Sequence, residues 1–340
     1  MLTSDIMNPS MSDQAIDLIA GGLDELKGLW QEAPLRSVML ADRSLNLPLP
    51  TDAIVHLRSQ KNGLIVLSAS EQRVLKLFFH PTFNQLLAVE TQTLMGFKNN
   101  PELKTSHYIN HGTTSTQGQW LLSTYCPNEV SFKLEENPTA AIYQVIEKDI
   151  YPLMTPFYQQ AGHCKITLET WLQSAQERSL NHPSKTKIQT LIEAIQADRQ
   201  FDPQMKLVQS MIHADLNENN IMCDHQGLAV IDWENRIEGL VLLDAFDRYT
   251  RHLQKLTIEK RLLFMALKLG RIFSPSYHHF FKGFTTWQAQ EFNCEIKPVT
   301  MRLHFLIYIV ERILVIQQTM KVDRFYRPGL EWRVWNAIKR

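Results

Sequence analysis

The sequence predicts an α+β fold in which a short β-rich region is followed by a longer, mainly helical one. Between residues 53 and 79, three short apolar runs are separated by turn residues, as is typical of consecutive strands. After residue 139, apolar residues mostly recur every three or four positions, as they do in helices, and this spacing predicts helices over Thr139–Pro152 and Lys185–Asp198. A loop rich in Asp and Asn, residues 213–222, interrupts the helical region and leads into an apolar run that ends on Asp232.

Length and composition indicate a globular protein with a packed core. The chain has 340 residues, of which 44% are hydrophobic and 21% are charged, so it can form one large domain or two lobes. Basic and acidic residues number 35 each, and the net charge by itself favours no class of partner. We expect no nucleic-acid partner, and the oligomeric state stays open.

The cysteine pattern and the hydropathy favour a cytoplasmic protein. The four cysteines are far apart and form no Cys-x-x-Cys pair, which disfavours a zinc site or a disulfide scaffold. No apolar run approaches the ~18–20 residues that span a bilayer. The most apolar helix candidate, Leu303–Ile316, carries Glu311 and Arg312. The N-terminus lacks a signal-peptide pattern, so we expect a cytoplasmic protein without a transmembrane segment.

Residues 1–50 are expected to form a helical extension ahead of the first strands. Its helix should span Asp13–Gln31, with Ser12 or Asp13 as its N-cap. Five apolar residues of this helix step by three or four positions and should therefore form one face: Ile16, Ile19, Leu23, Leu26 and Trp30. The segment Leu47-Pro48-Leu49-Pro50 is interpreted as a linker.

The β-rich region, residues 51–127, should begin with three antiparallel strands. These are Ala53–Arg58, Leu64–Leu67 and Arg73–Phe79. The turn Lys61-Asn62-Gly63 separates the first two, and Asn-Gly favours a tight hairpin. A helix is expected over Asn84–Phe97, and Gly118–Pro127 is predicted to be a strand that runs into a turn.

Lys76 is an unusual residue for its position, because it lies in the middle of the third apolar run. A lysine among apolar residues is costly unless its ammonium group is paired or faces a cleft. One interpretation is a lysine that binds nucleotide phosphates. The alternative is a lysine that points outward from an edge strand.

The loop and the run that follows it carry three residues suited to phosphoryl transfer. Asp215 and Asn220 are five positions apart, and Asp232 follows the apolar run 228–231. Phosphoryl transfer needs one carboxylate to orient the attacking hydroxyl, with an amide and a second carboxylate to hold Mg²⁺ on the phosphates. Mg²⁺ prefers such hard oxygen ligands. The alternative interpretation is a polar hairpin loop between two buried strands, where Asp and Asn are common.

Two segments resemble the catalytic loop of the aminoglycoside phosphotransferase and choline kinase group, a branch of the protein-kinase-like fold. They are His213-Ala214-Asp215-Leu216-Asn217-Glu218-Asn219-Asn220 and Ile231-Asp232-Trp233-Glu234. The group typically shows His-Gly-Asp-Leu-His-x-x-Asn, followed by Ile-Asp-Trp/Phe-Glu. Here Ala214 replaces the usual glycine, which matters only if φ is positive there, and Asn217 replaces the second histidine. Residues 213–217 also resemble the loop of bacterial kinases that phosphorylate sugar acids of lipopolysaccharide.

The resemblance implies a two-lobed protein-kinase-like fold with ATP and Mg²⁺ as cofactors. Residues 51–127 would form the nucleotide-binding N-lobe, and residues 128–340 the helical C-lobe with the catalytic loop and the acceptor pocket. Lys76 would bind the phosphates, and Glu90 would pair with it; the alternative is that Glu90 is an ordinary exposed helix residue. Asp244 would brace the catalytic loop or, alternatively, cap a helix.

In this family the loop residues have defined roles, which the resemblance implies here. Asp215 would be the catalytic residue that orients the hydroxyl and accepts its proton. Asn220 and Asp232 would be the metal ligands. His213 would support the loop, and Asn217 would face the acceptor.

The expected reaction is transfer of the γ-phosphate of ATP to a hydroxyl of a small molecule or glycan, such as a sugar, a sugar acid or an amino alcohol. Residues 241–340 hold 17 basic and 8 acidic residues, a balance of +9, which favours a neutral or anionic acceptor. The alternative is that these charges form a solvated face turned away from the cleft. One alternative is a non-catalytic nucleotide-binding regulator. The other is a kinase with a protein acceptor, which the missing Gly-x-Gly-x-x-Gly loop disfavours.

Overall fold

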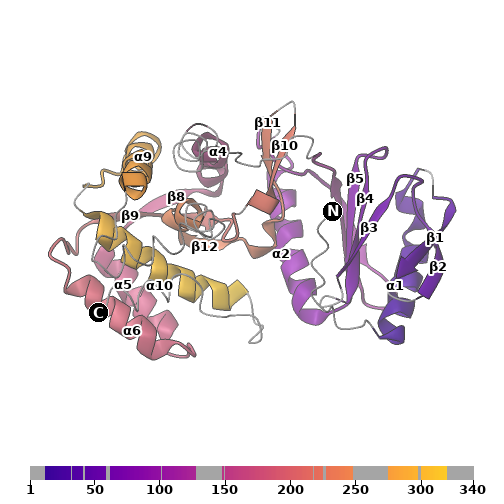
Figure 1. Cartoon of the computed structure of the whole chain (residues 1–340), viewed down its shortest axis with the longest axis horizontal. Coiled ribbons are helices and arrows are strands. Elements are labelled where there is room, and N and C mark those ends of the chain that lie inside the picture. The colour runs from indigo at the N-terminus through magenta and orange to yellow at the C-terminus, as the bar shows by residue number, and fades with distance from the viewer. Residues whose placement is uncertain are drawn as a thin grey trace. The chain divides into compact units, whose positions relative to one another are not determined.

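The structure is a computed structural model that describes residues 12–31, 33–40, 43–58, 62–100, 102–127, 148, 150–216, 218–224, 227–247, 275–297 and 300–319. They form two compact units. The first takes in the described residues of 1–130 and 222–234, and the second those of 131–221 and 235–340. The chain therefore enters the first unit a second time, between Met222 and Glu234. Figure 1 shows the elements of both units.

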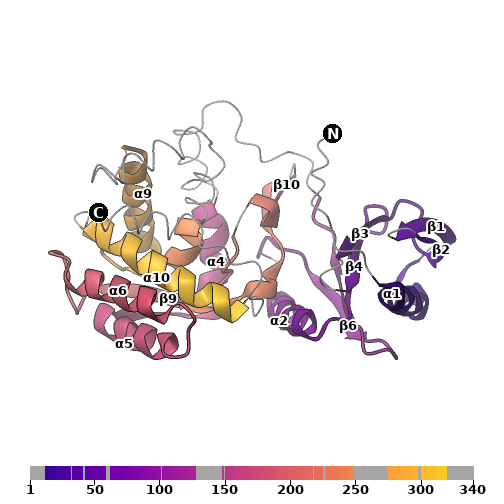
Figure 2. The ribbon, with the colours of Figure 1, turned by 60° about the horizontal axis from the view of Figure 1, so that its bottom comes forward.

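The first unit is built on a five-stranded antiparallel sheet with the strand order β3-β4-β5-β7-β6. Its elements are α1 (Asp13–Glu25), η1 (Lys27–Leu29), β1 (Leu35–Leu40), β2 (Arg43–Pro48), β3 (Ile54–Arg58), β4 (Gly63–Ser68), β5 (Arg73–Phe78), α2 (Pro81–Phe97), β6 (Tyr108–Thr113), β7 (Gln119–Thr124), β10 (Ile221–Asp224), β11 (Gly227–Val230) and η5 (Trp233–Asn235). Helices α1 and α2 lie on opposite faces of the sheet (Figures 1 and 2). The three strands expected between residues 53 and 79 are confirmed.

Helix α1 packs its apolar face on the sheet, as its sequence predicts. All five residues of the expected face are buried in one core together with apolar residues of β4, β5 and β7. Ser12 is the N-cap, and its hydroxyl accepts from the Ala15 N–H at 3.2 Å. The helix ends at Glu25 instead of Gln31, and the chain continues as the 3₁₀ turn η1. The predicted face extends to Trp30 because this turn keeps Leu26 and Trp30 on the core side.

The interpretation of Leu47-Pro48-Leu49-Pro50 as a linker is wrong. Leu47 and Pro48 are the end of β2, which forms an antiparallel hairpin with β1. Leu47 is 2% exposed and Leu49 is fully buried, both in the core that α1 shares with the sheet. Prolines are tolerated at the end of a hairpin edge, where no ladder hydrogen bond is needed. The segment therefore contributes to the core and does not separate two parts.

The turn before β4 needs its Asn-Gly pair for two different reasons. Asn62 has φ = 44°, a left-handed conformation that Asn adopts more readily than most residues. Gly63 pairs with Phe78 of β5, and a Cβ at Gly63 would lie 2.1 Å from the Leu77 carbonyl oxygen. Only glycine therefore allows β4 to approach β5 so closely. The first residue of the expected turn, Lys61, lies outside the described part.

The second unit is mainly helical, with a three-stranded antiparallel sheet in the order β12-β9-β8. Its elements are α4 (Tyr151–Ala161), β8 (His163–Thr167), α5 (Leu168–Ser179), α6 (Lys185–Gln196), β9 (Lys206–Ile212), η4 (Glu218–Asn220), β12 (Ile237–Leu240), α9 (Pro275–Phe292) and α10 (Met301–Thr319). The helices expected over 185–198 and 303–316 are confirmed as α6 and α10. The helix expected over 139–152 falls mostly on residues outside the described ranges.

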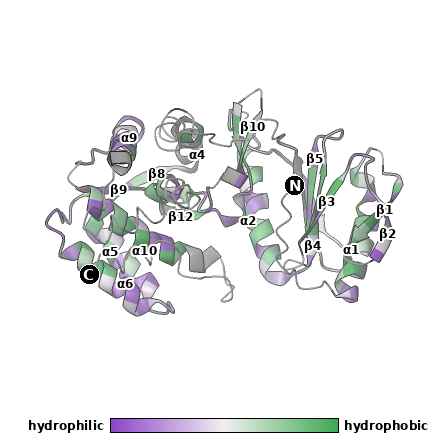
Figure 3. Cartoon of the chain, viewed as in Figure 1, coloured by the Kyte–Doolittle hydropathy of each residue, from purple (hydrophilic) through white to green (hydrophobic). Residues whose placement is uncertain are grey.

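Helices α5, α6 and α10 pack together in the core of the second unit (Figure 2). Helix α6 buries Ile188, Leu191, Ile192 and Ile195, whose spacing forms one face. Helices α1 and α6 each carry both hydrophobic and hydrophilic residues (Figure 3), as expected for helices that bury one side. The predicted fold class, an α+β protein with a small β-rich part and a larger helical part, is confirmed.

Helix α10 also buries a titratable residue, His304. The ring is fully buried, and Nδ1 lies 3.0 Å from the Thr300 carbonyl oxygen. Among the described residues, none gives Nε2 a hydrogen-bond partner. Burial lowers the pKa of His304 from 6.5 to about 4, because a proton on Nε2 would place a charge where nothing compensates it; the bond to Thr300 opposes this only weakly.

We expect the free energy of unfolding to fall as the pH is lowered from 6.5 to 4. In this range the unfolded chain binds a proton at His304 and the folded chain does not, so acid favours unfolding. The loss should reach about 3 kcal/mol, at 1.36 kcal/mol for each unit of pKa difference. Urea unfolding between pH 4 and 7.5 measures it, with His304→Gln as the variant that lacks the titration. An equal pH dependence in both proteins would contradict the prediction.

Candidate active site

Lys76 is the centre of a buried charge cluster in the first unit. Along β5, Leu75 and Leu77 face the core under α1, so Lys76 points to the opposite face, where α2 lies. Its Nζ atom is 2.8 and 2.6 Å from the two carboxylate oxygens of Glu90, and 2.6 Å from Oδ1 of Asp232. Lys76 is 9% exposed, and Glu90, on α2, is 2% exposed. The alternatives of an outward-facing lysine and an exposed glutamate are therefore wrong.

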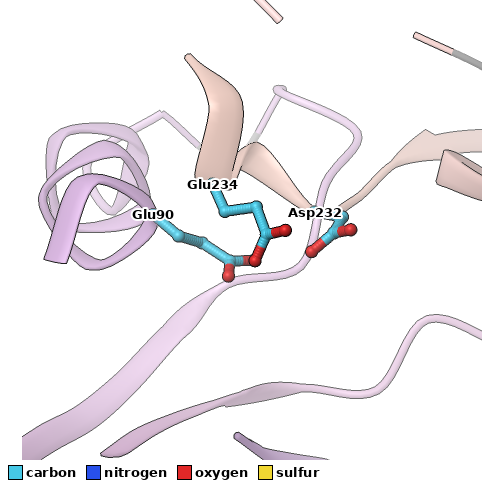
Figure 4. A group of neighbouring side chains, drawn as sticks. All are labelled: Glu90, Asp232 and Glu234. Atoms are coloured by element: carbon cyan, nitrogen blue, oxygen red, sulfur yellow. The ribbon is translucent and has the colours of Figure 1, made fainter. Parts of the chain in front are cut away.

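Three carboxylates surround this one ammonium group. Side-chain oxygens of Glu90, Asp232 and Glu234 lie within 4.8 Å of one another, and Figure 4 shows the three side chains directed toward a common point. Burial raises the pKa of Glu90 to about 7, and the negative charges of Asp232 and Glu234 add to this while Lys76 opposes it. Burial alone would lower the pKa of Lys76, but Asp232 and Glu90 raise it above its ordinary value.

The donor set of this cluster fits a divalent cation such as Mg²⁺. All three groups offer hard carboxylate oxygens, the ligands that Mg²⁺ prefers. Close to one another, the three acidic groups disfavour each other's ionised forms, and a divalent cation would stabilise those forms. Glu234 was not assigned a role from the sequence, although it stands two residues after Asp232 in the Asp-Trp-Glu segment and this spacing was the available signal.

Asp232 reaches Lys76 because the segment that carries it is anchored to the first unit. Thr105 forms a bridge with Val230, and its hydroxyl donates to the Val230 carbonyl at 2.6 Å. Trp233 donates its Nε1–H to the Thr105 hydroxyl at 3.0 Å and contacts Phe97 of α2 edge-on, with ring centroids 5.1 Å apart. These contacts fix both sides of Asp232, which has a left-handed φ of 65°.

The catalytic loop lies in the second unit, directly after β9. His213 is fully buried, and Asp244 accepts from the His213 N–H and from the Ala214 N–H, both at 2.8 Å. Tyr158 of α4 donates its hydroxyl to the same carboxylate at 2.8 Å. Burial raises the pKa of Asp244, and the groups that donate to it oppose that effect. Asp244 thus braces the loop, and the alternative of a helix N-cap is wrong because it lies inside a helical turn over 242–247.

Asp215 and Asn220 are brought together by the loop. The Asn220 side-chain amide donates to the Asp215 carbonyl oxygen at 2.9 Å and to Oδ2 of Asp215 at 3.3 Å. The Asp215 N–H in turn donates to Nδ1 of His213 at 3.3 Å. His213 therefore supports the loop, as the sequence predicts, whereas Asn217 lies outside the described residues.

Ala214 has φ = 62°, so the replacement of the family's glycine does matter here. A residue with a Cβ pays roughly 1–2 kcal/mol in the left-handed region. The expectation that alanine is a mild change holds only for negative φ, and the structure places this residue at positive φ.

The structure thus assembles the predicted residues in two groups, each within its own unit. Lys76, Glu90 and Asp232 form the first group, and Asp215 and Asn220 form the second. These are parts that a phosphoryl-transfer enzyme uses. They are a lysine fixed by a helix glutamate, an acidic residue beside that lysine, and a loop with Asp and Asn five residues apart.

Comparison with known proteins agrees with this class. Residues 152–247 match the model of the phosphotransferase enzyme family, APH. The matched segment includes β9, the loop with Asp215 and Asn220, and Asp232. The resemblance inferred from the two motifs is therefore confirmed, and with it the class of enzyme, a phosphotransferase. A comparison with curated proteins found no match.

Solved structures of kinases show a distant likeness. An amicoumacin kinase in complex with AMP-PNP and Ca²⁺ is 11% identical, with 96% of this chain and 95% of that chain covered and a TM-score of 0.49. A thermostable mutant of aminoglycoside phosphotransferase APH(4)-Ia is 11% identical, with coverages of 85% and 94% and a TM-score of 0.45. Aminoglycoside phosphotransferase APH(3″)-Id from Streptomyces rimosus is 12% identical, with coverages of 89% and 99% and a TM-score of 0.42.

A search of the described helices for membrane spans found none with both the length and the apolar character to cross a bilayer.

Proposed function

We propose that this protein transfers the γ-phosphate of ATP to a hydroxyl of a small molecule or glycan. The observation that carries the proposal is the contact of Lys76 with both Glu90 and Asp232, across 14 and 156 residues of sequence. Desolvating charges is costly, and a lysine buried between two acidic residues is the kind of charge cluster that is common at sites for charged ligands. Bound phosphate groups would pair with the positive charge of Lys76, and a divalent cation would pair with the negative charges of the carboxylates.

Each residue has a role in the proposed reaction. Lys76, steadied by Glu90, would neutralise charge on the phosphates. Asn220 and Asp232 would hold Mg²⁺, and Glu234 is a further candidate ligand. Asp215 orients the acceptor hydroxyl and accepts its proton as the new bond to phosphorus forms. When bound, Mg²⁺ would supply positive charge that stabilises the negative charge developing on the phosphates. Most of the rate enhancement should come from positioning and from electrostatic stabilisation.

The acceptor is proposed to be neutral or anionic, such as a sugar or a sugar acid, and not a polycation. The support is the excess of basic residues over 241–340, most of which lie outside the described ranges. A basic surface would attract an anionic glycan and repel an aminoglycoside. An amino alcohol is the third class within the proposal, and it would need an acidic or aromatic lining.

The cytoplasm is the proposed location. The four cysteines, all within the described residues, form no disulfide with one another, and Cys294 is buried. Free thiols are retained most easily in a reducing compartment.

The test is a screen for ADP release in the presence of Mg·ATP and single candidate acceptors. The panel should contain neutral sugars, sugar acids, amino alcohols, aminoglycosides and a generic protein substrate, and Asp215→Asn should serve as the inactive control. Turnover that depends on a sugar or sugar acid is the expected result. Binding of Mg·ATP without turnover on any acceptor would indicate a non-catalytic regulator, and labelling of protein would indicate a protein kinase.

A further inference from the structure

We propose that Arg312, on the last described helix, α10, is a positioning residue that holds the catalytic loop in its working conformation. Its Nη1 atom donates to the Ala214 carbonyl oxygen at 2.9 Å, across 98 residues of sequence. The same atom lies 2.5 Å from Oδ2 of Asp247. The kinetic part of this inference rests on the proposed function, in which Asp215 orients the acceptor hydroxyl.

The position of the guanidinium group is determined by buried neighbours. Arg312 is 7% exposed, Asp247 is 1% exposed, and Tyr308 is fully buried. Tyr308, one helical turn before Arg312, donates its hydroxyl to Oδ1 of Asp247 at 2.9 Å. Since a buried charge is costly to leave unpaired, the Arg312–Asp247 pair ties the arginine to one place, from which it reaches the loop.

The carbonyl that Arg312 binds belongs to the peptide plane that directly precedes Asp215. The N–H of this plane, that of Asp215, donates to Nδ1 of His213 at 3.3 Å. Both polar groups of the plane are therefore engaged, one by α10 and one by the loop itself. The contact with Arg312 therefore limits movement of this peptide, and with it of the backbone from which the Asp215 side chain extends.

Ala214 makes this support necessary. It has a left-handed φ of 62°, which an alanine adopts only when its surroundings determine it. Asp244 holds the N–H groups on one side of the residue, and Arg312 holds the carbonyl on the other. A glycine would take the same φ without strain. The alanine at this position and the arginine on α10 should therefore be coupled in their effects.

The neighbouring residue on α10 provides a matched control. Glu311 is 1% exposed, and its carboxylate accepts from Trp171 Nε1 at 2.9 Å and from Arg178 Nη2 at 2.7 Å. These partners lie on α5 and not on the loop. Glu311→Gln thus perturbs a buried ion pair of the same helix without removing a loop contact.

The experiment compares four variants of the full chain: Arg312→Lys, Ala214→Gly, the double variant, and Glu311→Gln. Lysine keeps a positive charge beside Asp247, but its side chain is shorter and ends before the position of Nη1, the atom that contacts both acceptors. The measurements are kcat and KM for ATP with the best acceptor, the melting temperature, and hydrogen exchange of the His213 and Ala214 amides.

Arg312→Lys should lower kcat by up to about 10²-fold, as misplacement of a reacting group does, with KM for ATP unchanged. The two amides should exchange faster than in the unaltered protein. Adding Ala214→Gly should restore kcat by roughly five- to tenfold, because glycine does not resist this φ. Glu311→Gln should lower the melting temperature and leave kcat and the exchange of these amides unchanged.

The proposal is wrong if Arg312→Lys behaves as Glu311→Gln does, or if the glycine restores nothing. Should Arg312→Lys not fold, Tyr308→Phe takes its place: by removing the hydroxyl that fixes Asp247, it should increase exchange of the same amides, and unchanged exchange would overturn the proposal. If the unaltered protein phosphorylates no acceptor, the proposed function fails, and amide exchange alone still decides whether Arg312 holds the loop.

Discussion

Replacing Asp215 by Asn is expected to abolish most phosphoryl transfer while the fold and nucleotide binding persist. The substitution keeps the size of the side chain and an oxygen that can accept from the Asn220 amide. In the unaltered protein, the nitrogen of this amide lies 3.3 Å from Oδ2 of Asp215. The substitution removes the carboxylate that orients the hydroxyl and accepts its proton. Loss of a positioned acid or base typically costs ~10²–10⁴ in rate, so kcat should fall by that factor with little change in KM for ATP.

Acceptor-dependent ADP release measures this effect, and calorimetry with a non-hydrolysable ATP analogue checks that the nucleotide still binds. Asp202→Asn is a suitable control, because Asp202 is an exposed aspartate of the same unit whose carboxylate accepts from the Gln204 N–H. Asparagine can keep that bond, so this variant should turn over normally. Near-normal turnover by Asp215→Asn would remove Asp215 from the mechanism.

Replacing Asp232 by Ala should weaken binding of Mg·ATP far more than Asp215→Asn does. Asp232 contacts Lys76 at 2.6 Å and lies in the cluster of three carboxylates proposed to hold the cation. Loss of a residue that only supports a metal ligand costs 10–100-fold in affinity, and loss of a ligand itself should cost at least about 100-fold. The buried Lys76 keeps Glu90 as a partner through two contacts, so the first unit should stay folded.

Calorimetric titration of Mg·ATP into each variant tests the order of affinities. Asp24→Ala is the matched control: Asp24 belongs to the same unit and its side chain is 69% exposed, in a surface ion pair with Lys27 that should contribute little. Titration in the presence of EDTA separates the metal-dependent part of the affinity from the rest. Equal affinities of the Asp232→Ala and Asp215→Asn variants for Mg·ATP would contradict the assignment of Asp232 as a ligand.

Local patterns in the sequence were sufficient for most elements of the fold. The stripe from Ile16 to Trp30 predicted a helix face, and the three runs between residues 53 and 79 predicted strands, because side chains within a few residues share one periodic backbone. The same reasoning did not apply to Leu47-Pro48-Leu49-Pro50. Its prolines favoured a linker, and only contacts with α1 and the sheet show that Leu47 and Leu49 are core residues.

The residues proposed for the site were identified in part from spacing and in part from resemblance to a family. Asp215, Asn220 and Asp232 stood out because carboxylates and an amide close in sequence suit phosphate-bound Mg²⁺. The pairing of Lys76 with Glu90 followed from the resemblance, and the structure shows the contact. For Glu234 the Asp-Trp-Glu spacing was the only signal in the sequence, and its closeness to Glu90 depends on how the segment 222–234 is anchored at Thr105.

The sequence by itself therefore determined the elements, the position of the loop and the chemical groups available for phosphoryl transfer. The tertiary structure alone decided the left-handed conformation of Ala214, the brace from Asp244 and the contact from Arg312. These depend on residues 30 and 98 positions away from Ala214. Local propensity extends over a few residues, whereas burial and pairing of charges are set by whichever distant elements pack against them. For this reason Arg312, which in the sequence only interrupts an apolar run, contacts the carbonyl group before Asp215 in the structure.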